Sequence, residues 1–218
     1  MIKKCLVSIM DVRFKHPFTC LLAGPTGSGK TVFTFELISL AHEMITPPPE
    51  KIMYCYGEYQ SVFNKYPHVT FNDGLPDLNE FDGKHRTLLI IDDLMREAGD
   101  SVEKIFTKMS HHRNISVIFL TQNLFFQSKN FRTMSINTKY LVVFKNPRDA
   151  RQIATLGQQM YPNDKKFLVD AFRQATEEPH GYLLIDLHQE TLQKYRIRSH
   201  IFSKDKQYVY CIRAQVDK

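Results

Sequence analysis

The chain has 218 residues, 43% of them hydrophobic, which is enough for one large domain, or a domain with a small appendage, around a buried core. Its net charge of +6 weakly favours an acidic partner such as nucleic acid. No apolar run reaches the length of a membrane span, the N-terminus lacks a secretory apolar region, and the four cysteines form no C-x-x-C pair. We therefore expect an intracellular protein with free thiols, neither secreted nor bound to a membrane.

A glycine-rich turn lies between the first predicted strand and the first predicted helix. Residues 18–23 form an apolar run typical of a buried strand, and residues 31–45 carry apolar side chains at helical spacing. Between them the chain reads Gly24-Pro25-Thr26-Gly27-Ser28-Gly29-Lys30-Thr31, which matches the phosphate-binding pattern G-x-x-x-x-G-K-[ST]. Strand, turn and helix form the context in which this pattern binds phosphate; a turn that serves only as a tight connection is the alternative.

The chemistry of the pattern explains its residue types. Glycines let successive backbone N–H groups converge on an anion, and the following helix adds the positive end of its dipole. Lys30 is expected to reach the β- and γ-phosphates of a nucleotide, and the hydroxyl of Thr31 to ligate Mg²⁺. The sequence therefore predicts a nucleoside triphosphate site at residues 24–31.

Two acids follow a strongly apolar strand at residues 87–91, which comes after a predicted strand at 51–56 and a brief extended piece at 68–71. The run Leu88 to Ile91 ends in Asp92 and Asp93 and has the form of a Walker B strand. We expect Asp92 to hold Mg²⁺ through water, and Asp93 to orient or deprotonate the attacking water, at a position where related ATPases usually have glutamate. The alternative is that both acids only end the strand and cap the following turn.

The rest of the chain continues the alternation of strands and helices. A capping-box-like start at Asp100 predicts a helix to about His112, and later elements are expected at 115–120 (strand), 140–144 (strand), 146–160 (helix), 164–175 (helix), 182–186 (strand) and 192–213 (two short strands). Short apolar strands between amphipathic helices predict a mainly parallel sheet with helices on both faces. The expected fold is α/β, a three-layer, RecA-like P-loop NTPase domain over residues 1–190, with a C-terminal β-hairpin-like extension of the same domain at 191–218.

The end of the fourth main strand carries a candidate catalytic amide. If this strand inserts between the first and third strands, Gln122 lies beside the γ-phosphate, where it can accept a hydrogen bond from water and donate one to a phosphate oxygen. An ordinary polar turn is the alternative. A strand inserted there is typical of RecA-like ATPases and is usually lacking in kinases and small GTPases. No guanine-reading N-K-x-D sequence follows, so we expect ATP to be the nucleotide.

Arginines outside these motifs are candidates for a role between subunits. Arg113 precedes the fourth main strand and, at a subunit boundary, would reach the nucleotide of a neighbour in trans as an arginine finger. A favourable cation at a helix C-terminus is the alternative, and Arg132 and Arg148 are rival fingers.

The tail is rich in cations that could contact a DNA backbone or, alternatively, protect exposed edge strands. These residues are Lys194, Arg196, Arg198, Lys204, Lys206 and Arg213.

Several blocks together resemble a known family. They are the phosphate loop at 24–31, Tyr54-Cys55-Tyr56-Gly57-Glu58-Tyr59-Gln60, Leu89-Ile90-Ile91-Asp92-Asp93-Leu94-Met95, His111-His112-Arg113-Asn114-Ile115-Ser116 leading to Phe119-Leu120-Thr121-Gln122-Asn123-Leu124-Phe125, Phe144-Lys145-Asn146-Pro147-Arg148-Asp149 and Gly181-Tyr182-Leu183-Leu184-Ile185-Asp186-Leu187-His188. This set resembles the FtsK/HerA-type genome-packaging ATPases, with the closest likeness to the poxvirus-type packaging ATPase of Polinton/Maverick transposons and adintovirus-like elements. The likeness covers about residues 18–190.

The resemblance implies a Mg²⁺-dependent ATPase that pumps double-stranded DNA into a preformed capsid. It implies a homo-oligomeric ring, pentameric or hexameric, which would meet a capsid vertex or portal-like component at a nuclear or cytoplasmic assembly site in a host cell. It further implies that Gln122 is a sensor and favours Arg113 as the finger.

Two other functions stay open from the sequence. One is a different DNA-translocating motor, such as a conjugative pump or a helicase, although no distinct helicase motif is visible. The other is a nucleotide-binding interaction module or kinase without motor activity.

Overall fold

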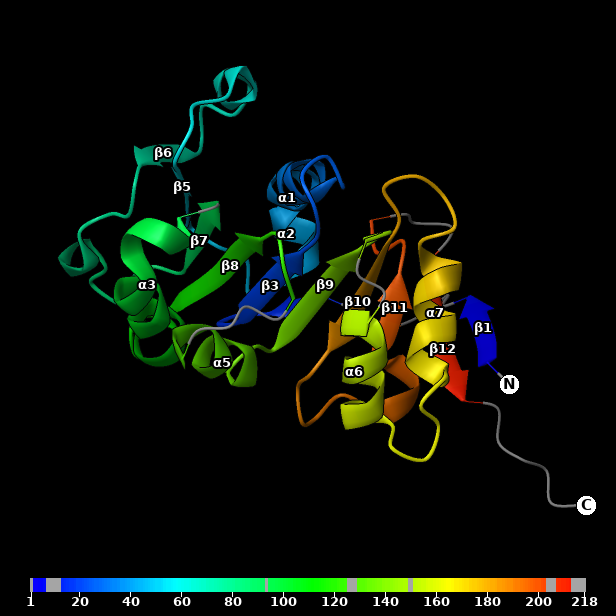
Figure 1. Cartoon of the computed structure of the whole chain (residues 1–218). Coiled ribbons are helices and arrows are strands. Elements are labelled where there is room, and N and C mark those ends of the chain that lie inside the picture. Colours follow the sequence, from blue (N-terminus) through cyan, green and yellow to red (C-terminus); the bar gives the residue numbers. More distant parts are fainter. Residues whose placement is uncertain are drawn as a thin grey trace, which may run out of the picture.

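The computed structural model describes residues 2–6, 13–92, 94–124, 129–148, 151–202 and 207–212. One ten-stranded sheet runs through these residues (Figure 1). Its strands in spatial order are β1 (Ile2–Leu6), β12 (Tyr208–Ile212), β11 (Ile197–Ser199), β10 (Tyr182–Asp186), β9 (Tyr140–Phe144), β3 (Thr19–Ala23), β8 (Ile115–Thr121), β7 (Thr87–Asp92), β5 (Lys51–Tyr56) and β6 (Thr70–Asp73). A separate parallel pair joins β2 (Phe14–Lys15) to β4 (Ile45–Thr46).

The sheet is parallel on one side and antiparallel on the other. Every pairing from β9 to β6 is parallel, and every pairing from β9 to β1 is antiparallel. In this arrangement β8 lies between β3 and β7, which is the insertion that the sequence predicted. The α/β fold with a mainly parallel central sheet is confirmed, and β10 to β12 extend that sheet together with β1.

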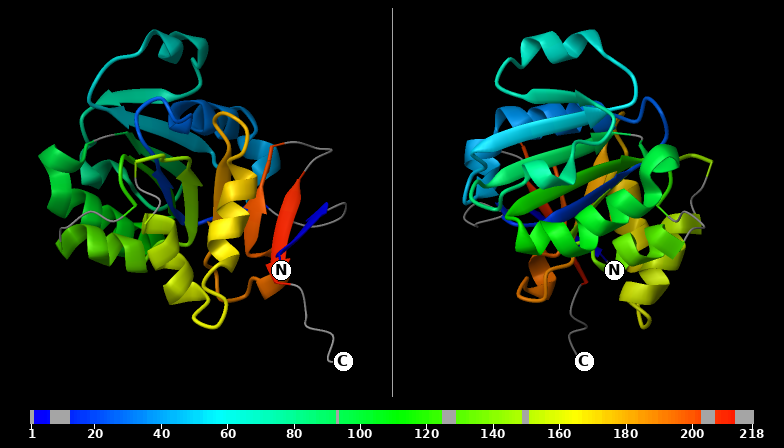
Figure 2. Two further views of the ribbon diagram at one scale, coloured as in Figure 1. Left: turned by 45° about the vertical axis from the view of Figure 1, so that its right-hand side comes forward. Right: turned by 90° about the vertical axis from the view of Figure 1, so that its left-hand side faces the viewer.

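Helices cover both faces of the sheet (Figure 2). One face carries α1 (Lys30–Ser39), α2 (Ala41–Met44) and a 3₁₀ turn at Ser61–Lys65. The other carries α3 (Met95–Lys104) with a π-helical turn at Ile105–Met109 and α4 (Ser110–His112), then α5 (Lys129–Ile136), α6 (Arg151–Met160) and α7 (Phe167–Ala175). Two further 3₁₀ turns lie at Leu78–Glu80 and Gln193–Tyr195. Among the described residues, no helix combines the length and apolar character needed to cross a bilayer.

Alternation along the buried strands builds two cores from one sheet. On β7, Leu88 and Ile90 pack into the core under α1, whereas Leu89 and Ile91 pack into the core under α3 and α5 to α7. All four side chains are fully buried. Successive residues of a strand point to opposite faces, so a wholly apolar run is what a sheet covered on both faces requires.

Some predicted boundaries were wrong. The first helix does not run unbroken to residue 45, because it breaks at Leu40 and Ile45 already belongs to β4. Asp100 does not begin a helix but lies inside α3, which starts five residues earlier at Met95. Neither β1 nor α5 was expected from the sequence pattern.

Candidate nucleotide-binding site

The phosphate loop connects the end of β3 to the start of α1. Gly27 and Gly29 have φ angles of 77° and 107°, in the left-handed region that favours glycine. A Cβ atom at Gly24 would lie 2.7 Å from both the Cβ of Phe144 and the Oγ of Ser28, so the close approach of β9 also requires glycine. The backbone of the loop is therefore shaped as its sequence predicted.

Lys30 is the first residue of α1, and its side chain folds back over the loop. Its Nζ donates hydrogen bonds to the carbonyl oxygens of Gly24 at 2.6 Å and Pro25 at 3.1 Å. These bonds hold the ammonium group against the loop. The loop itself is tied to β8, since the amide of Gly24 donates to the carbonyl of Thr121 at 3.1 Å.

The carboxylate of Asp92 is oriented by a buried tyrosine. Asp92 ends β7, and its Oδ2 accepts a 2.6 Å hydrogen bond from the hydroxyl of Tyr54 on the neighbouring strand β5. The ring of Tyr54 is fully buried and stacks on Phe35 of α1 with centroids 5.4 Å apart. Burial and the nearby carboxylate raise the pKa of Tyr54, so the phenol stays protonated and remains a donor to Asp92.

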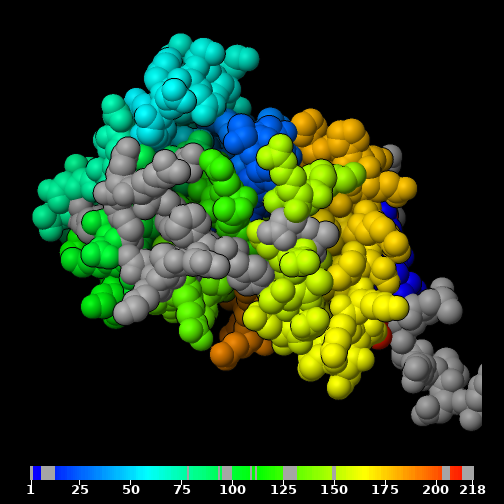
Figure 3. Space-filling view, viewed as in Figure 1, coloured from blue at the N-terminus to red at the C-terminus, as the bar shows by residue number. Residues whose placement is uncertain are grey.

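A cleft of about 600 Å³ joins the predicted motifs at the carboxyl ends of the parallel strands. Because β8 lies between β3 and β7, Gln122 reaches the same cleft as the phosphate loop and Asp92. The cleft is lined by Thr26, Gly27, Lys30, Thr31, Tyr56, Gly57, Glu58, Gln60, Asp92, Leu120, Thr121 and Gln122. In the space-filling view, the blue surface of the α1 region is exposed between the cyan segment near residue 60 and the amber segment near residue 180 (Figure 3).

Glu58 is a cleft residue that the sequence reasoning did not assign. It follows β5, whose residue Tyr56 is in register with Asp92, so Glu58 lies at the same edge of the sheet as the Walker B acid. Its side chain is exposed. The rule that carboxyl ends of parallel strands meet at one edge would have identified Glu58 once β5 was placed beside β7.

The remaining predicted site residues are Asp93 and three arginines. Asp93 falls outside the described residues, so its role as catalytic base stays a prediction. Arg113 lies before β8, at the amino ends of the parallel strands, where it lines a hollow of about 370 Å³ and its Nη1 donates to the carbonyl of Phe81 at 3.2 Å. Arg132 is exposed on α5, and Arg148 is exposed after β9.

The tail cations do not form one exposed set. Arg198 is only 5% exposed and forms a 2.9 Å ion pair with Asp186, so its prediction as a DNA contact was wrong. Arg196 is turned inward toward carbonyl oxygens of Asp186 and Thr191. The ammonium of Lys194 lies over the ring of Tyr195, and the remaining three cations, Lys204, Lys206 and Arg213, fall outside the described residues.

Three solved structures are similar to this chain over most of its length. The genome packaging NTPase B204 from Sulfolobus turreted icosahedral virus 2, solved with ATP-gammaS, matches 84% of this chain and 97% of its own with a TM-score of 0.51 at 15% identity. Thermomonospora curvata EccC (ATPases 2 and 3) matches 88% of this chain and 37% of its own (TM-score 0.49, 12% identity), and the KaiC-like protein PH0186 from Pyrococcus horikoshii OT3 matches 95% and 100% (0.47, 14%). No protein-family model matches the chain, and no curated protein does. The likeness to B204 shows the fold, that of a RecA-like P-loop NTPase.

The residues of the cleft fit a nucleoside triphosphate with Mg²⁺. Gly27 and Gly29 give the loop its left-handed backbone angles, a Cβ at Gly27 would meet no atom within 4 Å, and Lys30 supplies a cation bonded to the same loop. Thr31 and Asp92 offer the hydroxyl and carboxylate oxygens that Mg²⁺ prefers. Anion-binding and cation-binding groups therefore share one cleft, as a Mg²⁺–triphosphate complex requires.

Proposed function

We propose that this protein is a Mg²⁺-dependent ATPase that translocates double-stranded DNA during the packaging of a viral or virus-like transposon genome. The observation that carries the ATPase is the single cleft that Lys30, Thr31, Asp92 and Gln122 line together. DNA packaging is supported by the resemblance of residues 54–60 and 111–149 to packaging ATPases, by the net charge of +6, and by a structural neighbour that packages a genome.

Four residues of the cleft have a part in this reaction: Lys30, Thr31, Asp92 and Gln122. Backbone amides of the loop after Pro25 and the ammonium of Lys30 bind the phosphates and stabilise the charge that develops on them. Thr31 and Asp92 would hold Mg²⁺, which would neutralise negative charge on the phosphates. Gln122 positions the attacking water by accepting its hydrogen bond while donating to a phosphate oxygen.

Two carboxylates serve the attacking water in this proposal. Asp93, directly after Asp92, is the proposed base, and Glu58 is the carboxylate that the structure adds to the cleft. A carboxylate in reach of the water accepts its proton as the bond to phosphorus forms.

Arg113 completes the proposed site from a neighbouring subunit of a ring. It lies at the amino ends of the strands, at the edge of the sheet opposite its own cleft, which supports a role at a nucleotide held by another copy. We expect Arg113→Ala subunits to bind ATP normally and, mixed into wild-type oligomers, to lower hydrolysis by about 10³-fold at each site that they should complete. Full activity of such mixed oligomers would exclude Arg113 and direct the same test to Arg132 and Arg148.

The proposal is tested by the ATPase rate of the oligomer with and without double-stranded DNA. We expect DNA to stimulate hydrolysis, and stimulation to fall steeply as salt rises, because backbone phosphate contacts release counterions. Lys30→Ala is the control for contaminating ATPases. A wild-type oligomer that DNA does not stimulate would contradict the motor and leave a nucleotide-binding module or kinase, whereas unwinding of duplex DNA would identify a helicase. Stimulation with intact duplex would justify assays with capsid vertex components.

A further inference from the structure

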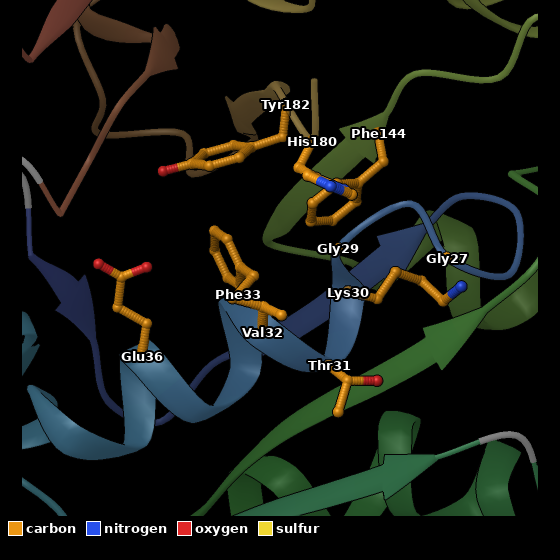
Figure 4. A pocket seen from close by; sticks show the side chains of 10 residues that line it. All are labelled: Gly27, Gly29, Lys30, Thr31, Val32, Phe33, Glu36, Phe144, His180 and Tyr182. Atoms are coloured by element: carbon orange, nitrogen blue, oxygen red, sulfur yellow. The ribbon is translucent and has the colours of Figure 1, made fainter. Parts of the chain in front are cut away.

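A second cavity, of about 370 Å³, opens on the other side of the phosphate loop (Figure 4). Gly27, Lys30 and Thr31 line both this cavity and the cleft with Asp92. The two hollows therefore meet at the start of α1. A ligand whose anionic part binds the loop could place its remaining part in the second cavity.

The walls of this cavity are aromatic and aliphatic, unlike those of the cleft. Phe33 packs edge to face against Tyr182 and Phe144, with ring centroids 4.9 and 6.0 Å apart, and these rings form its floor. Figure 4 shows Tyr182, His180 and Phe144 on one side of the cavity and the first turns of α1 on the other. Such a surface recognises a flat, weakly polar group and contributes little to binding phosphate.

Val32 is an exposed aliphatic residue in this wall. It directly follows Thr31 and is 70% exposed, although the neighbouring apolar residues Phe33 and Phe35 of α1 are buried. Covering an exposed valine removes apolar surface from water and so stabilises a complex. Because Val32 lies beside the phosphate loop, a ligand bound to the loop would cover its side chain.

His180 faces Val32 across the cavity from a strained backbone. Its φ angle is 60°, which is uncommon for a residue other than glycine. A Cβ atom at Gly29 would lie 3.2 Å from the Cβ of His180, so this residue is held against the phosphate loop. The strain keeps an imidazole ring at the mouth of a cavity next to a nucleotide loop, where such rings stack on bases.

Glu36 supplies a polar group at the far end. It lies six residues after Lys30, about 9 Å along the helix axis. Partial burial raises the pKa of this carboxyl group, although its side chain is exposed.

We infer that this cavity holds the base and ribose of the nucleotide, with the purine ring between Val32 and the imidazole of His180. The inference rests on the proposed function only in that the triphosphate binds at residues 24–31. Glu36 then accepts a hydrogen bond from an amino or hydroxyl group of the nucleoside. The phosphate loop binds only the phosphates, so recognition of the base needs a further surface, which the flat apolar walls of this cavity supply.

The test compares ATP with inorganic tripolyphosphate by calorimetric titration. We expect Val32→Ser and His180→Gly to weaken ATP binding by about tenfold or more, because base stacking is lost, and to change tripolyphosphate binding by less than about twofold. Glycine at 180 suits the φ angle of 60°, and Ile136→Ser, at a residue 75% exposed on α5, is the matched control expected to change neither affinity.

The outcomes separate this inference from the proposed ATPase. Equal losses for both ligands in Val32→Ser, or no loss for ATP in either variant, would overturn the base site and leave the phosphate loop standing. A wild-type protein that binds tripolyphosphate as tightly as ATP would overturn it too. A wild-type protein that binds neither ligand would reject the nucleotide site as a whole, and the base site with it.

Discussion

At the carboxyl ends of the parallel strands polar side chains line an open cleft, whereas at the amino ends two clusters of polar side chains are bonded to one another. The cleft brings Lys30, Asp92 and Glu58 to one volume of about 600 Å³. At the opposite edge, His16 contacts the Oγ of Ser116 at 2.5 Å and the Oδ1 of Asn114 at 2.9 Å. Both edges belong to the same sheet, and both carry charged and amide groups.

The antiparallel side adds a second bonded cluster to the amino edge. Asp186 ends β10 opposite Tyr140, the first residue of β9, and pairs with the buried Arg198. His188 donates its backbone amide to the same carboxylate and lies 3.2 Å from it through Nδ1. The charges of this cluster satisfy one another inside the fold.

The polar residues of the two edges therefore have different roles. The bonded clusters at the amino edge stabilise the fold, whereas the cleft residues at the carboxyl edge are placed to bind a ligand. A buried polar group needs a partner, and at the amino edge the partner is another side chain. At the carboxyl edge the groups converge on a solvent-filled volume that a ligand can occupy. We therefore expect substitutions at the carboxyl edge to change activity with little effect on stability, and substitutions in the bonded clusters of the amino edge, which do not include Arg113, to do the reverse.

The largest effect is expected for Lys30→Ala. Loss of the ammonium group removes phosphate binding and transition-state charge stabilisation, so we expect hydrolysis to fall by about 10³-fold or more. Lys139→Ala is the matched control, because its Nζ also donates to a backbone carbonyl, that of Pro17, but at the amino edge. Steady-state ATPase assays check both variants; equal losses would show that Lys30 acts only by bracing a loop.

Next in size is the loss of the buried ion pair through Asp186→Asn. This change leaves the guanidinium of Arg198 buried without its countercharge, and we expect the free energy of unfolding to drop by about 3–5 kcal/mol. Urea denaturation measures the drop, while the ATPase rate of the folded fraction should stay at the wild-type value. A drop under about 1 kcal/mol would show that the cluster is not a stability element.

The same cluster gives the pH dependence of stability a direction. Burial alone would raise the pKa of Asp186, but the hydrogen bond from His188 and the charge of Arg198 outweigh it and lower the pKa. Its stabilisation is therefore complete above the unfolded pKa of about 3.9 and is lost as pH falls through the lower folded value. Asp186→Asn should lose less stability than the wild type over that acidic range.

Glu58→Gln should reduce hydrolysis by about 10²-fold, with ATP affinity almost unchanged, because the amide cannot accept a proton from the attacking water. Asp93→Asn is the matched comparison at the other carboxylate. Single-turnover rates separate chemistry from binding. Wild-type rates in Glu58→Gln together with a loss in Asp93→Asn would place the base at Asp93 alone.

The smallest effect is expected for Ser116→Ala at the amino edge. The Oγ of Ser116 is buried, accepts the amide of Phe18 at 3.2 Å and contacts His16, so its removal leaves polar groups without a partner. We expect a loss of about 1–3 kcal/mol in the free energy of unfolding and an unchanged ATPase rate. A loss of activity without a loss of stability would break the contrast between the two edges.

The sequence predicted the strands that are apolar throughout and failed where pairing is remote. The strands at 51–56, 140–144 and 182–186 begin and end at the predicted residues, because short apolar runs between polar turns indicate buried strands. By contrast β1 contains two lysines among five residues, and its partner β12 is about 200 residues away along the chain. No pattern in the local sequence of β1 indicates that it pairs with β12.

The same physical limit applies to the site. Lys30, Thr31, Asp92 and Gln122 could be predicted to meet, since each follows from a motif or from the end of a buried strand. Glu58 was missed because its place in the cleft depends on which strand neighbours β7. Arg198 was wrongly predicted to be an exposed cation because Asp186, its ion-pair partner, lies on another strand.

The pairing of β9 with β10 has a consequence for a truncated form of this chain. Phe144 and Tyr182 are in register across the two strands, and both line the cavity beside the phosphate loop. Every nucleotide motif of the chain lies before residue 123, so a fragment ending at 148 would retain them all. On the placement inferred above, that fragment would keep the loop that holds the phosphates and lose the imidazole and phenol rings that surround the base. It would contain every nucleotide motif but would lack residues that we infer bind the nucleoside.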